Sequence, residues 1–433
     1  MVLGWKTSFV LLTLSLFTLP MNADSVTLLG TGAVSGDASD LSGLTGDICS
    51  GAVPTMCAPH NRLGGFGSGL AYTGQANTYI GVGDRGYFDG ITDIDYKDRF
   101  QVFQINVDPA NQKVKATLVD TRLFTNEAGV NLVGQTSAFN TVNPLNSLRF
   151  DPEGVRVAAD GSLYVSDEYG PYVFHFDRFG KVIERLTVPA KFLIANPSAV
   201  GTDELPPGNT AGRQSNRGME GLAISPDGTT LFGIMQNALI QDGALNDSNS
   251  RRGINNRILK IDLATGTTTE YVYQLYNRSN GVNEIVAIND HQFLLVERDG
   301  NAGTAAAFKK IVFIDITGAT DVSGDVLPQT GQTVVSGTHV GQNFVPVTKN
   351  VLFDLLDALY GLAGASFPEK IEGIAFGPDL ANGDHMLLVT SDNDLIATPT
   401  RIWAFQIPAS LIPEYVPQTI QPAWAPGQVK KGK

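Results

Sequence analysis

Residues 153–168, EGVRVAADGSLYVSDE, contain a short apolar strand, an Asp-Gly turn and a second apolar strand. The same order recurs three times later in the chain, each time beginning with a glutamate. These copies are EGLAISPDGTTLFGI at 220–234, EIVAINDHQFLLVER at 284–298 and EGIAFGPDLANGDHMLLVTSD at 372–392. Short apolar runs separated by Gly, Pro, Asn and Asp are typical of antiparallel strands joined by turns. The recurrence predicts a repeat architecture.

Each copy continues into a larger unit. A weaker fifth copy comes first, at residues 67–85, and has Ser68 where the others have glutamate. Third strands are predicted at 100–107, 172–176, 257–261, 310–314 and 401–407. Fourth strands are predicted at 115–124, 182–188, 268–275 and 347–355. The last unit lacks a fourth strand of its own, and residues 25–30 (SVTLLG) are predicted to fill that place and close a ring.

Units of four antiparallel strands are typical of propeller blades. One blade cannot bury both of its faces alone, so blades stack, and closure of the ring leaves few exposed edges. The sequence therefore predicts an all-β protein, a β-propeller of five or six four-stranded blades. A pair of β-sandwiches and a β-helix are the alternatives, and the grouping of the strands in fours disfavours both.

The N-terminus has the pattern of a signal peptide. Lys6 precedes an apolar stretch, residues 9–20, which is too short to cross a bilayer comfortably, and Ala23 provides a small residue for cleavage. We expect residues 1–23 to be a signal peptide and 24–433 a single propeller domain with loop insertions, located in the periplasm or secreted. A retained anchor helix is the alternative. No later segment is apolar enough to span a membrane after signal cleavage.

Charge and cysteine content narrow the possible partners. The chain has 433 residues and a net charge of −13, without a stripe of Lys and Arg, so no nucleic-acid partner is expected.

The two cysteines, Cys49 and Cys57, lie in one loop of an exported chain, which predicts a local disulfide. A metal pair is disfavoured because only His60 is nearby. We expect a monomer.

In four units the predicted innermost strand begins with a glutamate. In a propeller, equivalent positions of the innermost strands form a ring around the axis. Carboxylates in a ring raise one another's pKa unless a cation neutralises them. Ca²⁺ prefers several oxygen ligands, whereas zinc is poorly supported by only five histidines. A ring that only caps turns or pairs with arginines of the next blade, such as Arg85 or Arg298, is an equal alternative. The predicted metal ligands are Glu153, Glu220, Glu284 and Glu372.

A second tier of charged residues follows the second strands. Its acidic members are Asp84, Asp167, Glu168, Asp299, Asp392 and Asp394, and Arg85, Arg298 and Arg217 are interleaved with them. We predict that Asp84 or Asp167 is the catalytic base. Because a planar guanidinium binds two oxygens of an anion, Arg85 and Arg298 are predicted to bind the substrate.

Several of these stretches resemble a known family. SDEYGP at 166–171, FGK at 179–181, GMEGL at 218–222, PDG at 226–228 and IEGIA at 371–375 are similar to the phytase-like proteins called "esterase-like activity of phytase". The resemblance spans about residues 63–407. It implies a β-propeller that hydrolyses a small anionic ester or phosphoester, and β-propeller phytases use several Ca²⁺ ions in an acidic channel.

The resemblance has a limit and a second template. The chain lacks the Asp-Asp-Pro-Ala and Asn-Asn-Phe-Asp motifs of β-propeller phytases, so phytate itself is not implied as the substrate. Lactonase-type propellers also hold Ca²⁺ at the axis, through Glu, Asp and Asn. The leading hypothesis is therefore a Ca²⁺-dependent hydrolase, in which the metal polarises the substrate oxygen and activates water. The alternative is a non-catalytic exported propeller that binds a ligand or a protein partner on its loop face.

Overall fold

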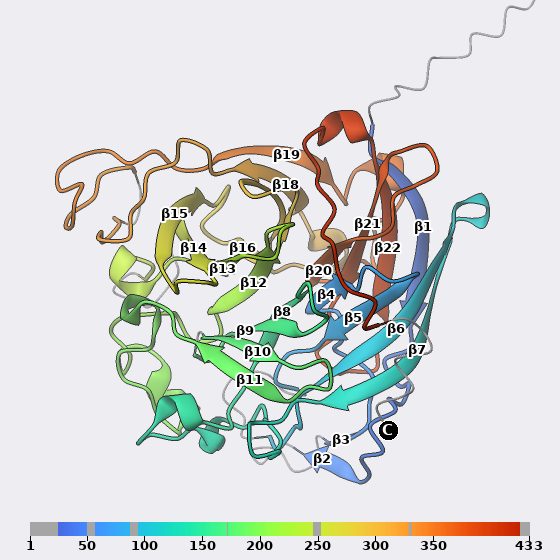
Figure 1. Ribbon diagram of the computed structural model, residues 1–433, viewed down its shortest axis with the longest axis horizontal. Coiled ribbons are helices and arrows are strands. Elements are labelled where there is room, and N and C mark those ends of the chain that lie inside the picture. The colour runs from blue at the N-terminus through green and yellow to red at the C-terminus, as the bar shows by residue number, and fades with distance from the viewer. Residues whose placement is uncertain are drawn as a thin grey trace, which may run out of the picture.

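The computed structural model describes residues 25–49, 57–86, 94–170, 172–245, 253–328 and 331–424. Its sheets are arranged around a common axis (Figure 1). The predicted signal peptide, 1–23, lies outside the described residues. Where helices occur in the described residues they are 3₁₀ turns of three or four residues, and none is long and apolar enough to cross a membrane.

Five blades of four strands each make up the ring. Blade 1 contains β4 (Gly69–Tyr72), β5 (Thr78–Val82), β6 (Arg99–Asp108) and β7 (Lys113–Leu123). Blade 2 contains β8 (Pro152–Val157), β9 (Leu163–Asp167), β10 (Tyr172–Phe176) and β11 (Val182–Leu186). Blade 3 contains β12 (Met219–Ile224), β13 (Thr230–Met235), β14 (Asn255–Asp262) and β15 (Thr268–Gln274). Blade 4 contains β16 (Gly281–Ala287), β17 (Gln292–Arg298), β18 (Lys309–Asp315) and β19 (Thr348–Asp354). Blade 5 contains β20 (Ile371–Phe376), β21 (His385–Ser391), β22 (Thr400–Ile407) and β1 (Thr27–Val34).

The ring closes in sequence order. The first strand of each blade contacts the first strand of the next, in the order β4, β8, β12, β16, β20 and back to β4. The prediction of a β-propeller is thus confirmed, and the number of blades is five. The predicted strands at 100–107 and 257–261 correspond to β6 and β14, which are longer by one or two residues at each end.

The N-terminal strand completes the last blade, as the sequence predicts. β1 runs antiparallel to β22, from Thr27 opposite Gln406 to Val34 opposite Thr400. A single parallel bridge between Thr31 and Lys113 also joins β1 to β7. This close approach requires glycine, because a Cβ at Gly32 would lie 2.2 Å from the carbonyl oxygen of Val114.

The core lies between the blades. The inner strands β12 and β20 are buried at every position, whereas the outer strand β19 is mostly exposed or half-buried. Phe124, which follows β7 and packs against Phe100 of blade 1, contacts Phe150 and Phe176 of the second unit. Aromatic side chains of this kind fill the wedge between radiating sheets, which neither blade could bury alone.

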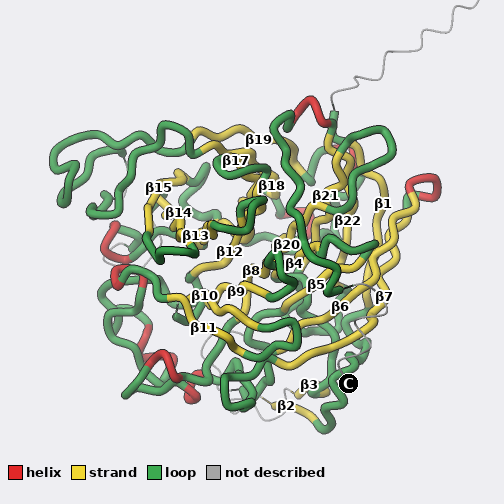
Figure 2. The backbone as a smooth tube through the Cα atoms, viewed as in Figure 1, coloured by secondary structure: helices red, strands yellow, loops and turns green. Residues whose placement is uncertain are grey.

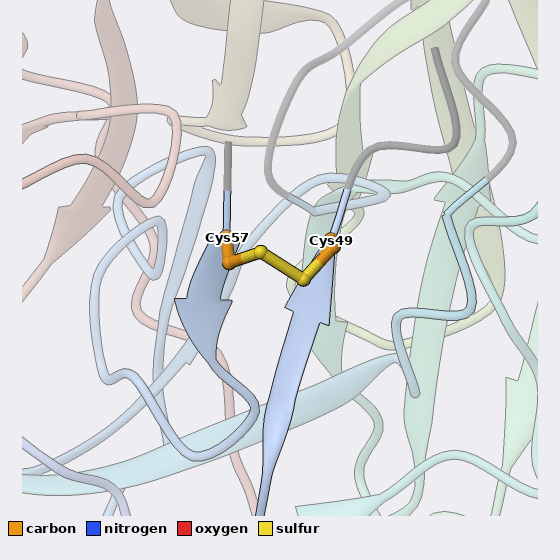
Figure 3. Close-up of a disulfide and its surroundings, with 2 residues drawn as sticks. All are labelled: Cys49 and Cys57. Carbon is orange, nitrogen blue, oxygen red and sulfur yellow. A yellow bond between two sulfur atoms is a disulfide. The ribbon is translucent and has the colours of Figure 1, made fainter. Parts of the chain in front are cut away.

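Two segments outside the blades are relevant to the site. β2 (Asp47–Cys49) and β3 (Cys57–Pro59) form a hairpin in which Cys49 and Cys57 are joined by the predicted disulfide, which is confirmed (Figure 3). Residues 412–424, which we call the C-terminal strap, cross the end of the axis where the inner strands finish. Long irregular connections, such as that between β18 and β19, extend from the ring (Figure 2).

Candidate functional site

The innermost strands of blades 2 to 5 have a bulge or a register shift near their first residues, and this irregularity determines which side chains reach the site. In blade 3, Met219 pairs with Met235 and Gly221 pairs with Ile234, so Glu220 is the extra residue. In blade 4 the same shift between Val282 and Glu284 makes Asn283 the extra residue. A bulge re-aims the side chain of the extra residue. Blades 2 and 5 shift register over Pro152–Val155 and Ile371–Ile374, which contain Glu153 and Glu372.

The ring therefore differs by one residue from the predicted ring. Asn283, and not Glu284, is equivalent to Glu220, and Glu284 occupies the place of Gly221. The prediction of Glu284 as a member of the ring is wrong because blade 4 lacks the Glu-Gly pair of the other copies. That missing glycine was the signal in the sequence that the alignment is shifted.

Glu284 has a different environment. Its Oε1 accepts the Leu222 amide at 3.0 Å and lies 2.9 Å from Arg156 Nη2. Burial raises the pKa of Glu284 to about 7, against the attraction of Arg156, which lowers it. Arg156 reaches from β8 to β16 and also donates to the carbonyl oxygen of Leu70 on β4 at 3.0 Å. The pair thus ties three blades together at the axis.

A cavity of ≈ 180 Å³ lies at the end of the axis where the inner strands begin, and we call it the axial cavity. Its lining is polar and rich in charge. Its acidic residues are Asp84, Glu153, Glu168, Glu220, Glu369 and Glu372. Its basic residues are Arg217, Arg298 and Lys370. Neither histidine nor cysteine is among the described residues of this lining, so the donor set consists of hard oxygens, which suit Ca²⁺ better than zinc.

Glu153 is the least compensated buried acid of the axial cavity. It is 6% exposed, and within the described ranges no hydrogen bond or ion pair reaches its carboxylate. Burial, and then the charges of Glu220 and Asp151, raise the pKa of Glu153 well above its usual value. Asn283 Oδ1, also at the ring, is buried without a hydrogen-bond donor. So is the hydroxyl of Ser68, the corresponding residue of blade 1.

The other two ring glutamates have partners. Glu220 accepts hydrogen bonds from the Gln236 amide and, at 3.4 Å, from Asn283 Nδ2. Burial, followed by the charge of Glu168, raises the pKa of Glu220 well above its usual value. Glu372 lies 2.7 Å from Arg298 Nη2. The predicted pairing of a ring glutamate with an arginine of the neighbouring blade therefore occurs at Glu372.

Glu153 belongs to a group of three carboxylates. Asp151, Glu153 and Glu168 each have an oxygen within 4.8 Å of the others. Arg85 forms ion pairs with Asp151 and, at 3.2 Å, with Glu168. Arg85 is buried and is not part of the described lining of the axial cavity, so its guanidinium neutralises these carboxylates and is not placed to bind a substrate there. Arg298, the other predicted substrate-binding residue, does line the cavity.

The two predicted bases are separated. Asp84 lines the axial cavity. Asp167 lines a different cavity with Arg149 and accepts the backbone amides of Asp151 and Tyr169, both at 3.1 Å. Burial raises the pKa of Asp167 to about 6, and Arg149 opposes that shift. The structure therefore brings Asp84, and not Asp167, to the ring, and Asp167 holds the turn after β9.

Lys370 was not singled out from the sequence. It precedes β20 and lies among Asp84, Asp392 and Asp394, three acids of the predicted second tier. At the other end of the axis, beyond the Arg156–Glu284 pair, lies a more apolar cavity of ≈ 160 Å³ that the C-terminal strap partly lines. The axis is thus divided into an acidic end and an apolar end.

Comparisons with known proteins place the chain in a family. It is 26% identical to an uncharacterized secreted protein of Arthroderma benhamiae over 445 residues, which is 80% of this chain and 86% of that protein. Two solved structures are each 12% identical to this chain. The match to a luciferin-regenerating enzyme covers 83% of this chain and 95% of that one, with a TM-score of 0.30. The match to a streptogramin B lyase covers 76% of this chain and 72% of that one, with a TM-score of 0.27. The model of the phytase-like family described as "Esterase-like activity of phytase" matches residues 61–395, and the chain belongs to this family.

Proposed function

We propose that this chain is an exported Ca²⁺-dependent hydrolase of phosphoesters or carboxylic esters that acts at the axial cavity. The observation that carries the proposal is the Glu153 carboxylate, which faces this cavity buried and without a partner in the described residues. A buried carboxylate is unfavourable unless it is protonated or neutralised. Export is supported by the predicted signal peptide and by the relative described as secreted.

The residues around the cavity fit a hard divalent cation. Glu153, Glu220 and Glu372 would hold it together with the amide oxygen of Asn283, which is buried without a donor. Ca²⁺ accepts oxygen ligands in a flexible geometry, whereas Mg²⁺ requires a near-ideal octahedron. When bound, Ca²⁺ would polarise the substrate oxygen and lower the pKa of a water molecule.

The chain's own residues supply the remaining chemistry. Asp84, on the wall of the axial cavity, is the proposed general base that accepts a proton from water. Arg298 is held in place by its ion pair with Glu372, and its guanidinium lies in the wall where an anionic group of the substrate would be bound. Arg217, which donates to Gln236, is a second cation of this wall.

The test is hydrolysis of p-nitrophenyl phosphate and p-nitrophenyl acetate with added Ca²⁺ or with EDTA. We expect activity on one or both compounds that EDTA abolishes and Ca²⁺ restores. Glu153→Gln should lower kcat/KM at least tenfold at a fixed Ca²⁺ concentration, because it removes a charged ligand. Glu184→Gln, at an exposed position of β11, is the matched control and should retain the parent activity.

The alternative is a non-catalytic propeller that binds a small ligand or a protein. The ion pairs of Arg298 and Lys370 favour it, since they neutralise acids of the cavity without a metal. Absence of hydrolysis in both conditions, with a melting temperature that EDTA leaves unchanged, would remove the proposed hydrolase and favour this alternative.

A further inference from the structure

Three acidic side chains converge beside the axial cavity, at the junction of blades 5 and 1. Asp84, Asp392 and Asp394 each have an oxygen within 4.8 Å of the others, an arrangement that could hold a metal ion. Asp84 follows β5, and the other two follow β21, so the closure of the ring brings them together. Mutual repulsion of such a group requires a counter-charge.

The counter-charge is supplied by a lysine of the chain itself. Lys370 Nζ lies 3.5 Å from Asp84 Oδ2 and 3.6 Å from Asp392 Oδ2, and it donates a hydrogen bond to Asp394. A single ammonium therefore touches all three carboxylates. Asp392 is 4% exposed; its Oδ2 accepts the Asp394 amide at 2.8 Å, while its Oδ1 is buried without any donor. The group thus has an unused acceptor oxygen in addition to those that Lys370 contacts.

We propose that the Lys370 ammonium occupies a second cation site, so that the protein holds one metal ion at the ring and a fixed lysine where another ion would bind. The count of one ion rests on the proposed function, whereas the occupation of the Asp84 group by Lys370 does not. An ammonium and a divalent ion cannot share these oxygens, because they would need the same ligand positions and would repel each other.

The lysine also has a positioning role in the proposed site. Lys370 and Asp84 both line the axial cavity. The ammonium holds the Asp84 carboxylate at the cavity wall. Unlike a bound metal ion, the lysine cannot dissociate from the protein or exchange with ions in solution. Glu372, two residues along the chain, belongs to the ring, so one short segment places both the lysine and a ring ligand.

Ca²⁺ stoichiometry tests the inference, measured by equilibrium dialysis on folded protein. Lys370→Met removes the ammonium and should add one Ca²⁺ per chain to the number bound by the parent. Lys370→Met combined with Asp394→Asn should return the number to that of the parent. Lys310→Met, which removes a lysine 3.5 Å from Asp354 in blade 4, is the control and should change nothing.

The outcomes separate this inference from the proposed function. A folded Lys370→Met protein with unchanged stoichiometry would overturn the inference, even if Glu153→Gln still loses the ring ion. A parent that binds no Ca²⁺, with a Lys370→Met protein that binds one, would support the inference and refute the ring ion. Should Lys370→Met not fold without metal, refolding on Ca²⁺ addition supports it. Asp394→Asn in the parent provides a further check, because loss of one ion there would show that a metal already occupies the group.

Discussion

Removal of the Arg156 guanidinium should be the most destabilising single change at the axis. Arg156 joins β8 to the carbonyl oxygen of Leu70 on β4 and to Glu284 on β16. Arg156→Met would leave the Glu284 carboxylate, which is 0% exposed, without its cation. Breaking a buried ion pair from one side costs about 3–5 kcal/mol, and a typical domain has only about 5–15 kcal/mol of stability.

Substitution of the acidic partner, Glu284, should cost less. In Glu284→Gln the amide oxygen can still accept the Leu222 amide hydrogen, so only the charge is lost. Because burial disfavours the charge that this variant removes, we expect it to cost less than about 1 kcal/mol at pH 8. In a double-mutant cycle with Arg156→Met the two costs should not add, because both remove the same interaction.

The pH dependence follows from the raised pKa of Glu284. Its value is about 7 in the folded protein, against 4.5 for the free side chain. A carboxyl with a raised folded pKa contributes stability that is fully present below pH 4.5 and is lost as the pH rises through 7. The size of this loss is about 3 kcal/mol. Without Arg156 the folded pKa should rise further, so Arg156→Met should be more destabilising at pH 8 than at pH 5.

The assay is urea unfolding followed by fluorescence of the buried Trp403 and Trp424, at pH 5 and at pH 8. Lys310→Met, which removes a half-exposed ion pair of blade 4, is the control and should cost less than about 1 kcal/mol. An Arg156→Met protein that loses less than about 1 kcal/mol at both pH values would refute the view of this pair as the tie between blades.

Two other predictions concern the edges of the ring. Burial, and then the charge of Arg99, lower the pKa of His60 to about 4, so the contribution of His60 to stability is present above pH 6.5 and is lost as the pH falls towards 4. His60→Gln should therefore lose less unfolding free energy than the parent between pH 7 and pH 4.5, and equal losses in urea titrations would contradict this. Trp424, fully buried at the end of the C-terminal strap, donates to the Gly161 carbonyl oxygen. Trp424→Ala should cost about 3–5 kcal/mol and expose the strap to trypsin or chymotrypsin, and a protease pattern like that of the parent would argue against the strap as a fixed element.

The fold was predictable because its signals are local. Strands at 172–176 and 268–275 follow from apolar alternation between turns, and the structure has β10 and β15 there. The need for an N-terminal strand in blade 5 follows from counting strands per unit. Each of these inferences uses only period-two alternation and turn residues, which the sequence displays directly.

The site was less predictable because it depends on single-residue register. Neighbouring strand residues point to opposite faces, so Glu168 lines the axial cavity and Asp167 does not. In the same way, Asp84 lines the axial cavity and its neighbour Arg85 does not. Glu284 was predicted for the ring in place of Asn283 because blade 4 lacks the Glu-Gly pair that marks this position in the other copies. Lys370 was not predicted because it precedes the ring strand, whereas the charged residues that were predicted follow the second strands.

The asymmetry of the ring bears on whether it is structural or functional. On the side of blades 5 and 1, the protein supplies its own cations, with Arg298 on Glu372 and Lys370 on Asp84. On the side of blade 2, Arg85 serves Asp151 and Glu168, and Glu153 is left without a partner among the described residues. A purely structural ring would be compensated at each position, because every uncompensated buried charge costs stability. The structural explanation therefore fits the side of blades 5 and 1, whereas the Glu153 side is where the proposed cation would supply a positive charge that no described residue supplies.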